Sequence, residues 1–177
     1  MKERNYLIKL YSENCMAKVE FTPYILREAA DIYSFRIEGE KESEFGKFLV
    51  MFKDIKDPYL LDDFNRIVLA ISKMSEDGVL ENFFRSEGKV DDRVVAIPLE
   101  IKESGHIRET LRLYCIRLSD KLLILGNGGI KRTRTYQEDK WLKECVETLQ
   151  KIDKELMDLE ECGVVLEDKI MNINLEL

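Results

Sequence analysis

The chain has 177 residues, of which 45% are hydrophobic and 36% charged, and its net charge is −7 from 28 basic and 35 acidic side chains. This length fits one domain or two small ones, and nine glycines with three prolines exclude collagen and low-complexity polymers. No apolar run approaches the ~18 residues that a membrane-spanning helix needs, so we expect no membrane association.

The N-terminal and cysteine patterns predict a cytoplasmic protein. Met1–Asn5 is too charged, and the apolar stretch after it too short, for a signal peptide. The cysteines, Cys15, Cys115, Cys145 and Cys162, are then thiols, and the absence of a CxxC pair and the single histidine disfavour a zinc site. We expect them to be small buried hydrophobic residues, and we expect no cofactor.

Charge is segregated along the chain. Residues 1–82 carry 12 basic and 16 acidic side chains, residues 83–136 carry 11 and 7, and residues 137–177 carry 5 and 12. The acidic total therefore hides a central segment with a net charge of +4. Because a basic surface of this kind can bind nucleic acid, the pI of about 5.0 does not exclude RNA as a partner.

Strands and then helices are expected in the first half of the chain. Residues 6–11 and 16–21 flank a turn and are typical of a strand pair that Pro23 ends. The pattern of residues 24–36 does not distinguish helix from strand. Four apolar side chains at helical spacing then predict a short helix; they are Phe45, Phe48, Leu49 and Phe52.

A second helix follows directly. Asp57-Pro58 is a favourable N-cap with proline at the first helical position, and Asp77-Gly78 is a plausible end. Between them, apolar residues form a broad stripe on one face. Two helices joined by a short loop are expected to form an antiparallel hairpin.

Three antiparallel strands are expected next. Residues 94–101 are rich in β-branched side chains, although Pro98 demands an edge position or a bulge. Residues 111–118 alternate, and residues 122–125 supply their hairpin partner. The intervening loop holds His106, the only histidine, which we expect to be solvated.

A glycine-rich segment, a long helix and a tail complete the chain. Gly126–Gly129 lacks both phosphate-loop motifs, so a nucleotide-binding loop is disfavoured. Thr135 and Glu138 form a capping box that predicts a helix closing near Gly163. Residues 164–177 look extended, with a hairpin about Glu167 and Asp168, and are expected to pair with the N-terminal strands.

This order of elements, with three motifs inside it, resembles the RelE/ParE/HigB toxins of bacterial toxin–antitoxin systems over about Pro58–Leu156. Ile130–Thr135 is similar to the lysine-lysine-threonine run of HigB-like members. Leu111–Tyr114 is similar to the arginine-containing central strand. Phe83–Arg85, which precedes a glycine, is similar to the leucine-arginine-glycine step that enters the sheet.

The resemblance implies an α+β fold in which a helical hairpin packs on an antiparallel β-sheet. Residues 57–161 would form this core, residues 1–56 an N-terminal strand and helix extension, and residues 162–177 an extended tail after a long C-terminal helix. We expect a single domain because no Gly/Ser/Pro-rich linker separates these parts.

The family's chemistry suggests the candidate residues. Cleavage of RNA by its own 2′-hydroxyl needs a base, an acid and cations on the phosphate. Arginine titrates too high to be a good base, so Arg112 and Arg132 are expected to clamp the scissile phosphate, as arginines at the matching positions do in the family. Tyr136 is expected to stack on a base or relay a proton. Further phosphate contacts are expected from Arg85, Lys102, Lys131 and Arg134.

Three functions remain open. The first is a toxin-like endoribonuclease that cuts messenger RNA on the ribosome. The second is a binding protein for a gyrase-type target or an antitoxin, because messenger-cleaving members carry two lysines on a strand whose counterpart, Val94–Leu99, has none. The third is an interaction domain that is no longer toxic. A helix-turn-helix antitoxin is the implied partner, and the sequence leaves the oligomeric state open.

Overall fold

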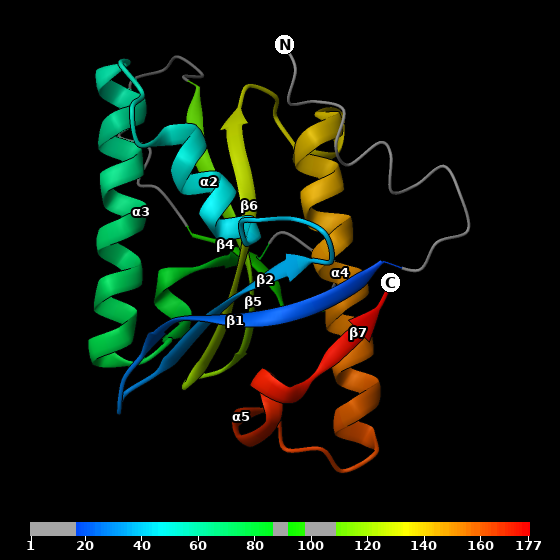
Figure 1. Ribbon diagram of the computed structural model, residues 1–177. Helices are drawn as coiled ribbons and strands as arrows, with labels where there is room; N and C mark the ends of the chain where they lie inside the picture. The colour runs from blue at the N-terminus through cyan, green and yellow to red at the C-terminus, as the bar shows by residue number, and fades with distance from the viewer. Residues whose placement is uncertain (1–16, 87–91, 98–108) are drawn as a thin grey trace.

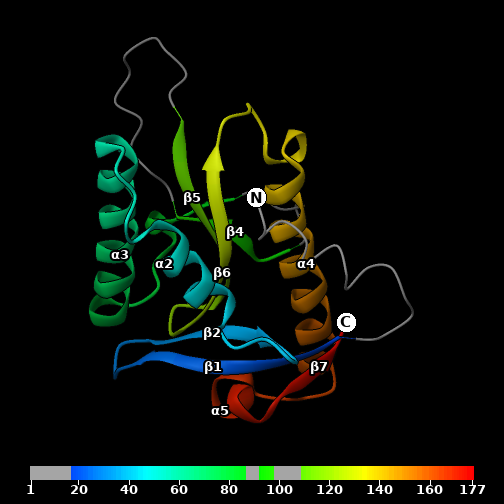
Figure 2. The same ribbon diagram turned by 45° about the horizontal axis from the view of Figure 1, so that its top comes forward.

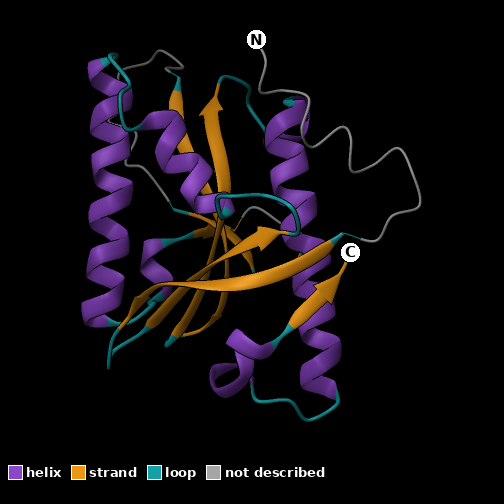
Figure 3. Ribbon diagram, in the orientation of Figure 1, coloured by secondary structure: helices purple, strands orange, loops and turns teal. Residues whose placement is uncertain are grey.

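The computed structural model describes residues 17–86, 92–97 and 109–177 (Figure 1). The strand expected over residues 6–11 lies outside the described residues, as do Pro98, Lys102 and His106. Within the described parts, helices flank a twisted sheet on both of its faces (Figures 1 and 3). The α+β class expected from the sequence is therefore confirmed.

The strands of the described residues are β1 Lys18–Leu26, β2 Asp31–Ile37, β3 Arg85–Ser86, β4 Val94–Ala96, β5 Thr110–Ser119, β6 Leu122–Lys131 and β7 Asn174–Glu176. They form one mixed sheet in the order β3-β4-β5-β6-β2-β1-β7. Strands from the expected N-terminal extension, core and tail thus share one sheet.

The helices of the described residues are α2 Glu44–Phe52, α3 Pro58–Asp77, α4 Lys140–Glu161 and α5 Leu166–Lys169, with 3₁₀ turns η1 Glu81–Phe83, η2 Tyr136–Glu138 and η3 Ile170–Asn172. Helices α2 and α3 cover one face of the sheet, and α4 covers the other (Figure 2). Each face has its own apolar core, because side chains of alternate strand residues point to opposite faces.

The two expected helices are confirmed. Ser43 caps α2, and the carboxylate of Asp57 accepts the backbone N–H groups of Tyr59 and Leu60 at the start of α3. The rings of Phe48 and Phe64 stack 6.2 Å apart between the two helices. In Figure 1, α2 rises and α3 descends beside it, so the helical hairpin has the expected sense.

The expected antiparallel sheet is confirmed in its centre and is wrong at one pair. Strand β5 pairs antiparallel with both β4 and β6. Strand β2 pairs parallel with β6, from Asp31 opposite Leu122 to Ser34 opposite Leu125. A parallel pair needs a crossover connection, and this one runs through α2, α3 and the first strands of the antiparallel sheet.

The second strand of the expected N-terminal pair corresponds to β1, which pairs with β2; its expected partner, residues 6–11, lies outside the described residues. Pro23 does not end β1 but lies inside it, next to an irregularity in register before Ile25. Strand β7 covers only Lys18–Glu20 of β1, so the proline lies where the strand has become a sheet edge, a position that tolerates a missing N–H. The segment left unassigned, residues 24–36, contains the end of β1 and all of β2 except Ile37.

The long helix begins later than the capping box predicts. The Thr135 hydroxyl donates to Glu138 Oε1 at 2.9 Å instead of capping the helix, and these residues border the 3₁₀ turn η2. Helix α4 begins at Lys140, where the Asp139 carboxylate accepts the Leu142 N–H at 3.1 Å. The side chain of an N-cap residue accepts a backbone N–H of the first helical turn that has no partner within the helix. A side-chain cap was therefore correctly expected, but the capping residue is Asp139 and not Thr135.

The C-terminal tail is helical before it is extended. Leu166 and Ile170, four residues apart, are buried in the core beneath α4, and this spacing places both on one side of a helical turn. The expected hairpin about Glu167 is therefore wrong. The expected pairing with the N-terminal strands is confirmed for β7, which lies antiparallel to β1.

Candidate functional site

Two of the candidate residues, Arg112 and Lys131, lie on β5 and β6 at the end of this hairpin that is away from its turn. Thr110 pairs with Lys131, and Arg112 pairs with Gly129. Arg112 lies two residues before Tyr114, whose side chain is in the core beneath α4, so both project to the same face. The arginine expected to clamp a phosphate thus points toward the helix.

Arg112 is only 3% exposed. Its neighbour across the sheet, Gly129, has no side chain, and a Cβ there would lie 3.2 Å from Leu142 and from Trp141. Helix α4 therefore approaches the strand closely beside Arg112. The indole Nε1 of Trp141 donates to the Gly128 carbonyl at 2.8 Å and holds the start of α4 against the strand.

The glycine cluster is part of β6, which continues to Lys131, beyond the residues 122–125 expected for this strand. A register shift between Leu113 and Cys115 gives β6 one extra residue there, the signature of a β-bulge. A Cβ on Gly128 would lie 1.9 Å from the Arg112 carbonyl oxygen, and one on Gly126 3.0 Å from Leu149 of α4. These glycines serve close packing of backbone and helix.

Tyr136 also lies in the core, at 9% exposure. It begins the 3₁₀ turn before α4, and its ring meets that of Tyr114 edge-on at 6.2 Å. The structure thus brings Arg112 and Tyr136 to the same face of the sheet near the start of α4. Neither side chain is presented to solvent, where an RNA strand would lie.

The remaining candidates are more accessible. Arg132 is 57% exposed, and its Nε donates to Glu109 Oε1 at 2.9 Å. Arg134 is exposed, Lys131 is half-buried, and Arg85 is exposed on the short edge strand β3. Lys102 lies outside the described residues. The described candidates therefore divide into two inside the protein and four around its surface.

A polar network that the sequence analysis missed lies where β2 leaves β6. The Ser34 hydroxyl donates to the Leu125 carbonyl at 2.9 Å and accepts the Phe45 N–H at 3.1 Å. Asn127 Nδ2 donates to Glu44 Oε2 at 2.8 Å. Phe45 and Glu44, at the start of α2, thus supply hydrogen-bond partners to Ser34 and Asn127 at the point where β2 stops pairing with β6. Buried polar groups need such partners.

The charge of Glu44 is matched within the same network. Its other carboxylate oxygen is 2.6 Å from Lys47 Nζ, which also lies 3.6 Å from Glu40. Burial raises the pKa of the nearby Cys145 thiol well above its usual value, and the negative charge of Glu44 adds to the effect. The sequence signal was Asn127, the one polar side chain between Leu122 and Ile130.

A second buried carboxylate joins β4 to α4. Asp153 is fully buried and accepts both the backbone N–H of Arg93, at 2.9 Å, and its Nε, at 2.7 Å. The same guanidinium donates to Glu160 at 2.7 Å. Buried charge of this kind is retained only when it is paired, so we assign these residues to holding the helix on the sheet.

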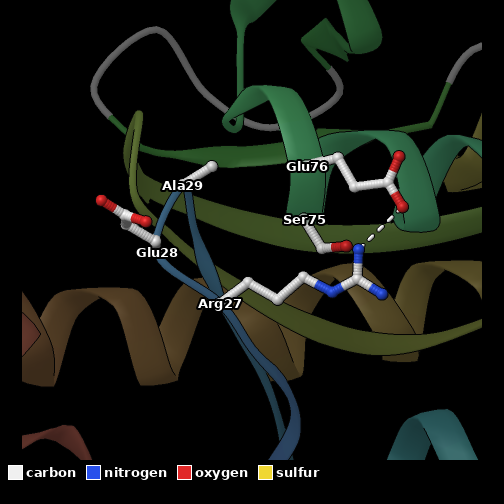
Figure 4. A pocket seen from close by; sticks show the side chains of 5 residues that line it. All are labelled: Arg27, Glu28, Ala29, Ser75 and Glu76. Atoms are coloured by element: carbon white, nitrogen blue, oxygen red, sulfur yellow. Dashed lines mark hydrogen bonds and ion pairs between the residues drawn. The ribbon is translucent and has the colours of Figure 1, made fainter.

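An open depression of about 610 Å³ lies between the β1–β2 turn and the end of α3 (Figure 4). Its lining residues are Arg27, Glu28, Ala29, Ser75 and Glu76. Arg27 Nη1 donates to Glu76 Oε1 at 2.7 Å, so the cation is already neutralised. Among the described residues, no group of three or more histidine, cysteine, aspartate or glutamate side chains could hold a metal ion.

Comparisons of the chain with protein-family models, with curated proteins and with solved structures gave no match. The similarity to RelE/ParE/HigB toxins therefore stays a prediction that rests on sequence motifs and element order. No helix in the described parts of the chain is long and apolar enough to cross a membrane.

Proposed function

We propose that the chain is the toxin-like component of a toxin–antitoxin pair and that it acts by binding a protein rather than by cutting RNA. The toxin-like part of the proposal rests on the resemblance of Pro58–Leu156. The non-catalytic part rests on one observation, the burial of Arg112 at 3% exposure.

The chemistry of RNA cleavage explains why this observation matters. Cations stabilise the transition state only when their donors lie within hydrogen-bond distance of the reacting phosphate. Arg112 and Tyr136 are in the core, whereas Arg132 is exposed beside Glu109. A surface phosphate held by Arg132 would have no access to the other two, so the three expected catalytic side chains do not share one substrate.

The exposed cations favour a protein partner with an acidic segment. Arg132 and Arg134 lie two residues apart just after β6, and Lys140 is exposed at the start of α4. Arg132 is 2.9 Å from Glu109 and Lys140 is 3.9 Å from Glu144, so an acidic partner would have to displace these two carboxylates. An acidic or amphipathic segment of a helix-turn-helix antitoxin would complement this charge. Because exposed ion pairs are screened by salt, the binding should weaken as ionic strength rises.

The experiment is co-expression of the chain with the product of the adjacent reading frame, followed by measurement of the affinity at several salt concentrations. We expect a stable complex that Arg132→Glu and Arg134→Glu together weaken, while Arg27→Glu, far along the sheet, leaves it unchanged. If neither the double variant Arg132→Glu, Arg134→Glu nor added salt lowers the affinity, the partner does not bind at these arginines.

The second candidate is a ribosome-dependent messenger RNA endonuclease. It is favoured by the close succession of Lys131, Arg132 and Arg134 at the end of β6, because several phosphate contacts raise RNA affinity. It predicts new cleavage sites in cellular RNA on expression, which a binding protein does not produce.

A further inference from the structure

Strand β7 pairs with one edge of β1 at the border of the sheet (Figure 1). The backbone groups of Ala17 and Leu177 exchange two hydrogen bonds, of 3.2 and 2.9 Å, and Val19 lies opposite Leu175. On the other edge of β1, Val19 pairs with β2. Both edges of β1 are therefore paired at this residue, and a further strand can bind there only by displacing a neighbour.

The strand expected over residues 6–11 needs the edge that β7 occupies. Joined to β1 by a four-residue turn, it would place Leu10 opposite Ala17 and Ile8 opposite Val19. At both positions the C-terminal segment places a leucine. The two segments therefore cannot pair with this part of β1 at the same time.

The two segments have the same alternation of apolar side chains. Directly opposite residues of neighbouring strands point to the same face of a sheet. Three apolar side chains at the end of the chain lie in or against the core beneath α4; they are Ile173, Leu175 and Leu177. The N-terminal hairpin would bring three others to this face; they are Tyr6, Ile8 and Leu10. Either segment can therefore complete the apolar core beside β1.

The charge opposite Lys18 differs between the two arrangements. In the structure, Glu176 lies opposite Lys18. In the hairpin, the residue opposite Lys18 would be Lys9, and like charges directly opposite one another destabilise a strand pair. This difference favours β7 as the partner of β1.

We propose that residues 6–11 and β7 are alternative partners of β1, so that the N-terminal strand of the chain can displace the C-terminal strand. Leu166 and Ile170, buried in the core, still anchor the tail when β7 leaves. The displaced strand is free to pair with the sheet edge of another protein. The exchange therefore switches which terminus the protein offers to a partner.

Amide hydrogen exchange of the full chain, measured by NMR, distinguishes the two arrangements. Because Ala17 and Leu177 form a hydrogen-bonded pair, Val19 and Leu175 form the next one. Displacement of β7 frees the Leu175 N–H, whereas the Val19 N–H is bonded in both arrangements. Protection of Leu175 thus reports the population in which β7 is displaced.

Reversing the charge at position 9 should shift the balance toward the hairpin. Lys9→Glu would set opposite charges at Lys18 and should lower the protection of the Leu175 N–H at least roughly threefold, with that of Val19 unchanged. The matched control is Lys2→Glu, which makes the same charge change outside the expected strand and should alter neither amide. Equal protection of Leu175 in the two variants would overturn the proposal.

Weakening β7 gives a second test. In Leu175→Asn the Val19 N–H should stay protected, because residues 6–11 take the edge. Adding Ile8→Asn should lower this protection at least roughly tenfold, whereas adding Leu7→Asn, on the opposite face of the strand, should not. Circular dichroism checks that each variant is folded. Loss of Val19 protection in Leu175→Asn alone would also overturn the proposal, and neither test bears on the proposed antitoxin partner.

Discussion

The side chains of Glu44 and Asn127, 83 residues apart in the sequence, are joined by a buried hydrogen bond of 2.8 Å. It ties the first turn of α2 to the bulged middle of β6, where β2 has ceased to pair. Parallel pairing between β2 and β6 ends at Ser34 and Leu125, and the hydrogen bond lies just beyond that point. The start of α2 therefore takes the place of a neighbouring strand for this part of β6.

Loss of the amide at position 127 should destabilise the protein. In Asn127→Ala the buried carboxylate of Glu44 loses a donor, and leaving a buried acceptor unsatisfied costs about 1–3 kcal/mol. Urea denaturation measures this free energy of unfolding. Glu42→Ala, at an exposed carboxylate two residues from Glu44, is the control and should change it by less than about 0.5 kcal/mol. Equal effects of the two variants would contradict the role given to the hydrogen bond.

A methyl group on Gly128 should be far more damaging than one on Gly46. At position 128 it would lie 1.9 Å from the Arg112 carbonyl oxygen, in backbone that cannot move aside; we expect Gly128→Ala to cost more than about 4 kcal/mol or to prevent folding. At position 46 its nearest neighbour is the flexible end of Glu42, at 3.0 Å. Gly46→Ala should be neutral or stabilise α2 by up to about 1 kcal/mol. Thermal unfolding of both variants tests the contrast.

Arg112 and Arg132 should differ in their effect on stability. Arg112→Ala truncates a buried side chain and should lower the free energy of unfolding by about 2–4 kcal/mol through lost packing. Arg132→Ala breaks only an exposed ion pair with Glu109, which is worth about 0–1 kcal/mol. Denaturant melts of the two variants give the comparison. A stable Arg112→Ala protein would argue that this arginine is kept for function.

Two buried thiols should make the protein less stable at high pH. Burial raises the pKa values of Cys115 and Cys145 above their usual 9.0, so the folded state retains protons that the unfolded state loses. Stability from these groups is complete below pH 9.0 and declines as the pH rises above it. Unfolding measured from pH 7 to 10 should show this decline, and Cys115→Ala should lessen it. In the native protein at pH 8, a thiol reagent should modify the exposed Cys162 before either buried cysteine.

Local signals predicted the helical hairpin and the β5–β6 strands well. The spacing of Phe45, Phe48 and Phe52 determines only α2, and the Asp57-Pro58 cap determines only the start of α3. Each signal can therefore be recognised without knowledge of the rest of the fold. The glycines of β6 could not be placed in this way. Their close approach to Arg112 and Leu149 depends on a bulge and on a helix that begins further along the chain.

The expectation that Arg112 would contact a phosphate was wrong for a related reason. The alternation of Leu111, Arg112 and Leu113 predicts a strand with Arg112 on the other face from the leucines, and the structure agrees. Alternation cannot say whether that face meets water or a helix, and α4 covers it. The hydrogen bond between Glu44 and Asn127 could not be predicted from the sequence either, because each polar residue taken alone is compatible with an exposed turn.

Whether the chain cuts RNA is decided by a map of RNA 5′ ends across the cell after the chain is expressed, with Arg132→Ala expressed in parallel. Both proteins should be checked for equal amount and equal folding. We expect that neither protein creates new 5′ ends beyond those of uninduced cells, because the side chains expected to cleave RNA do not meet at one phosphate. New cleavage sites that appear with the wild-type chain and vanish with Arg132→Ala would contradict it.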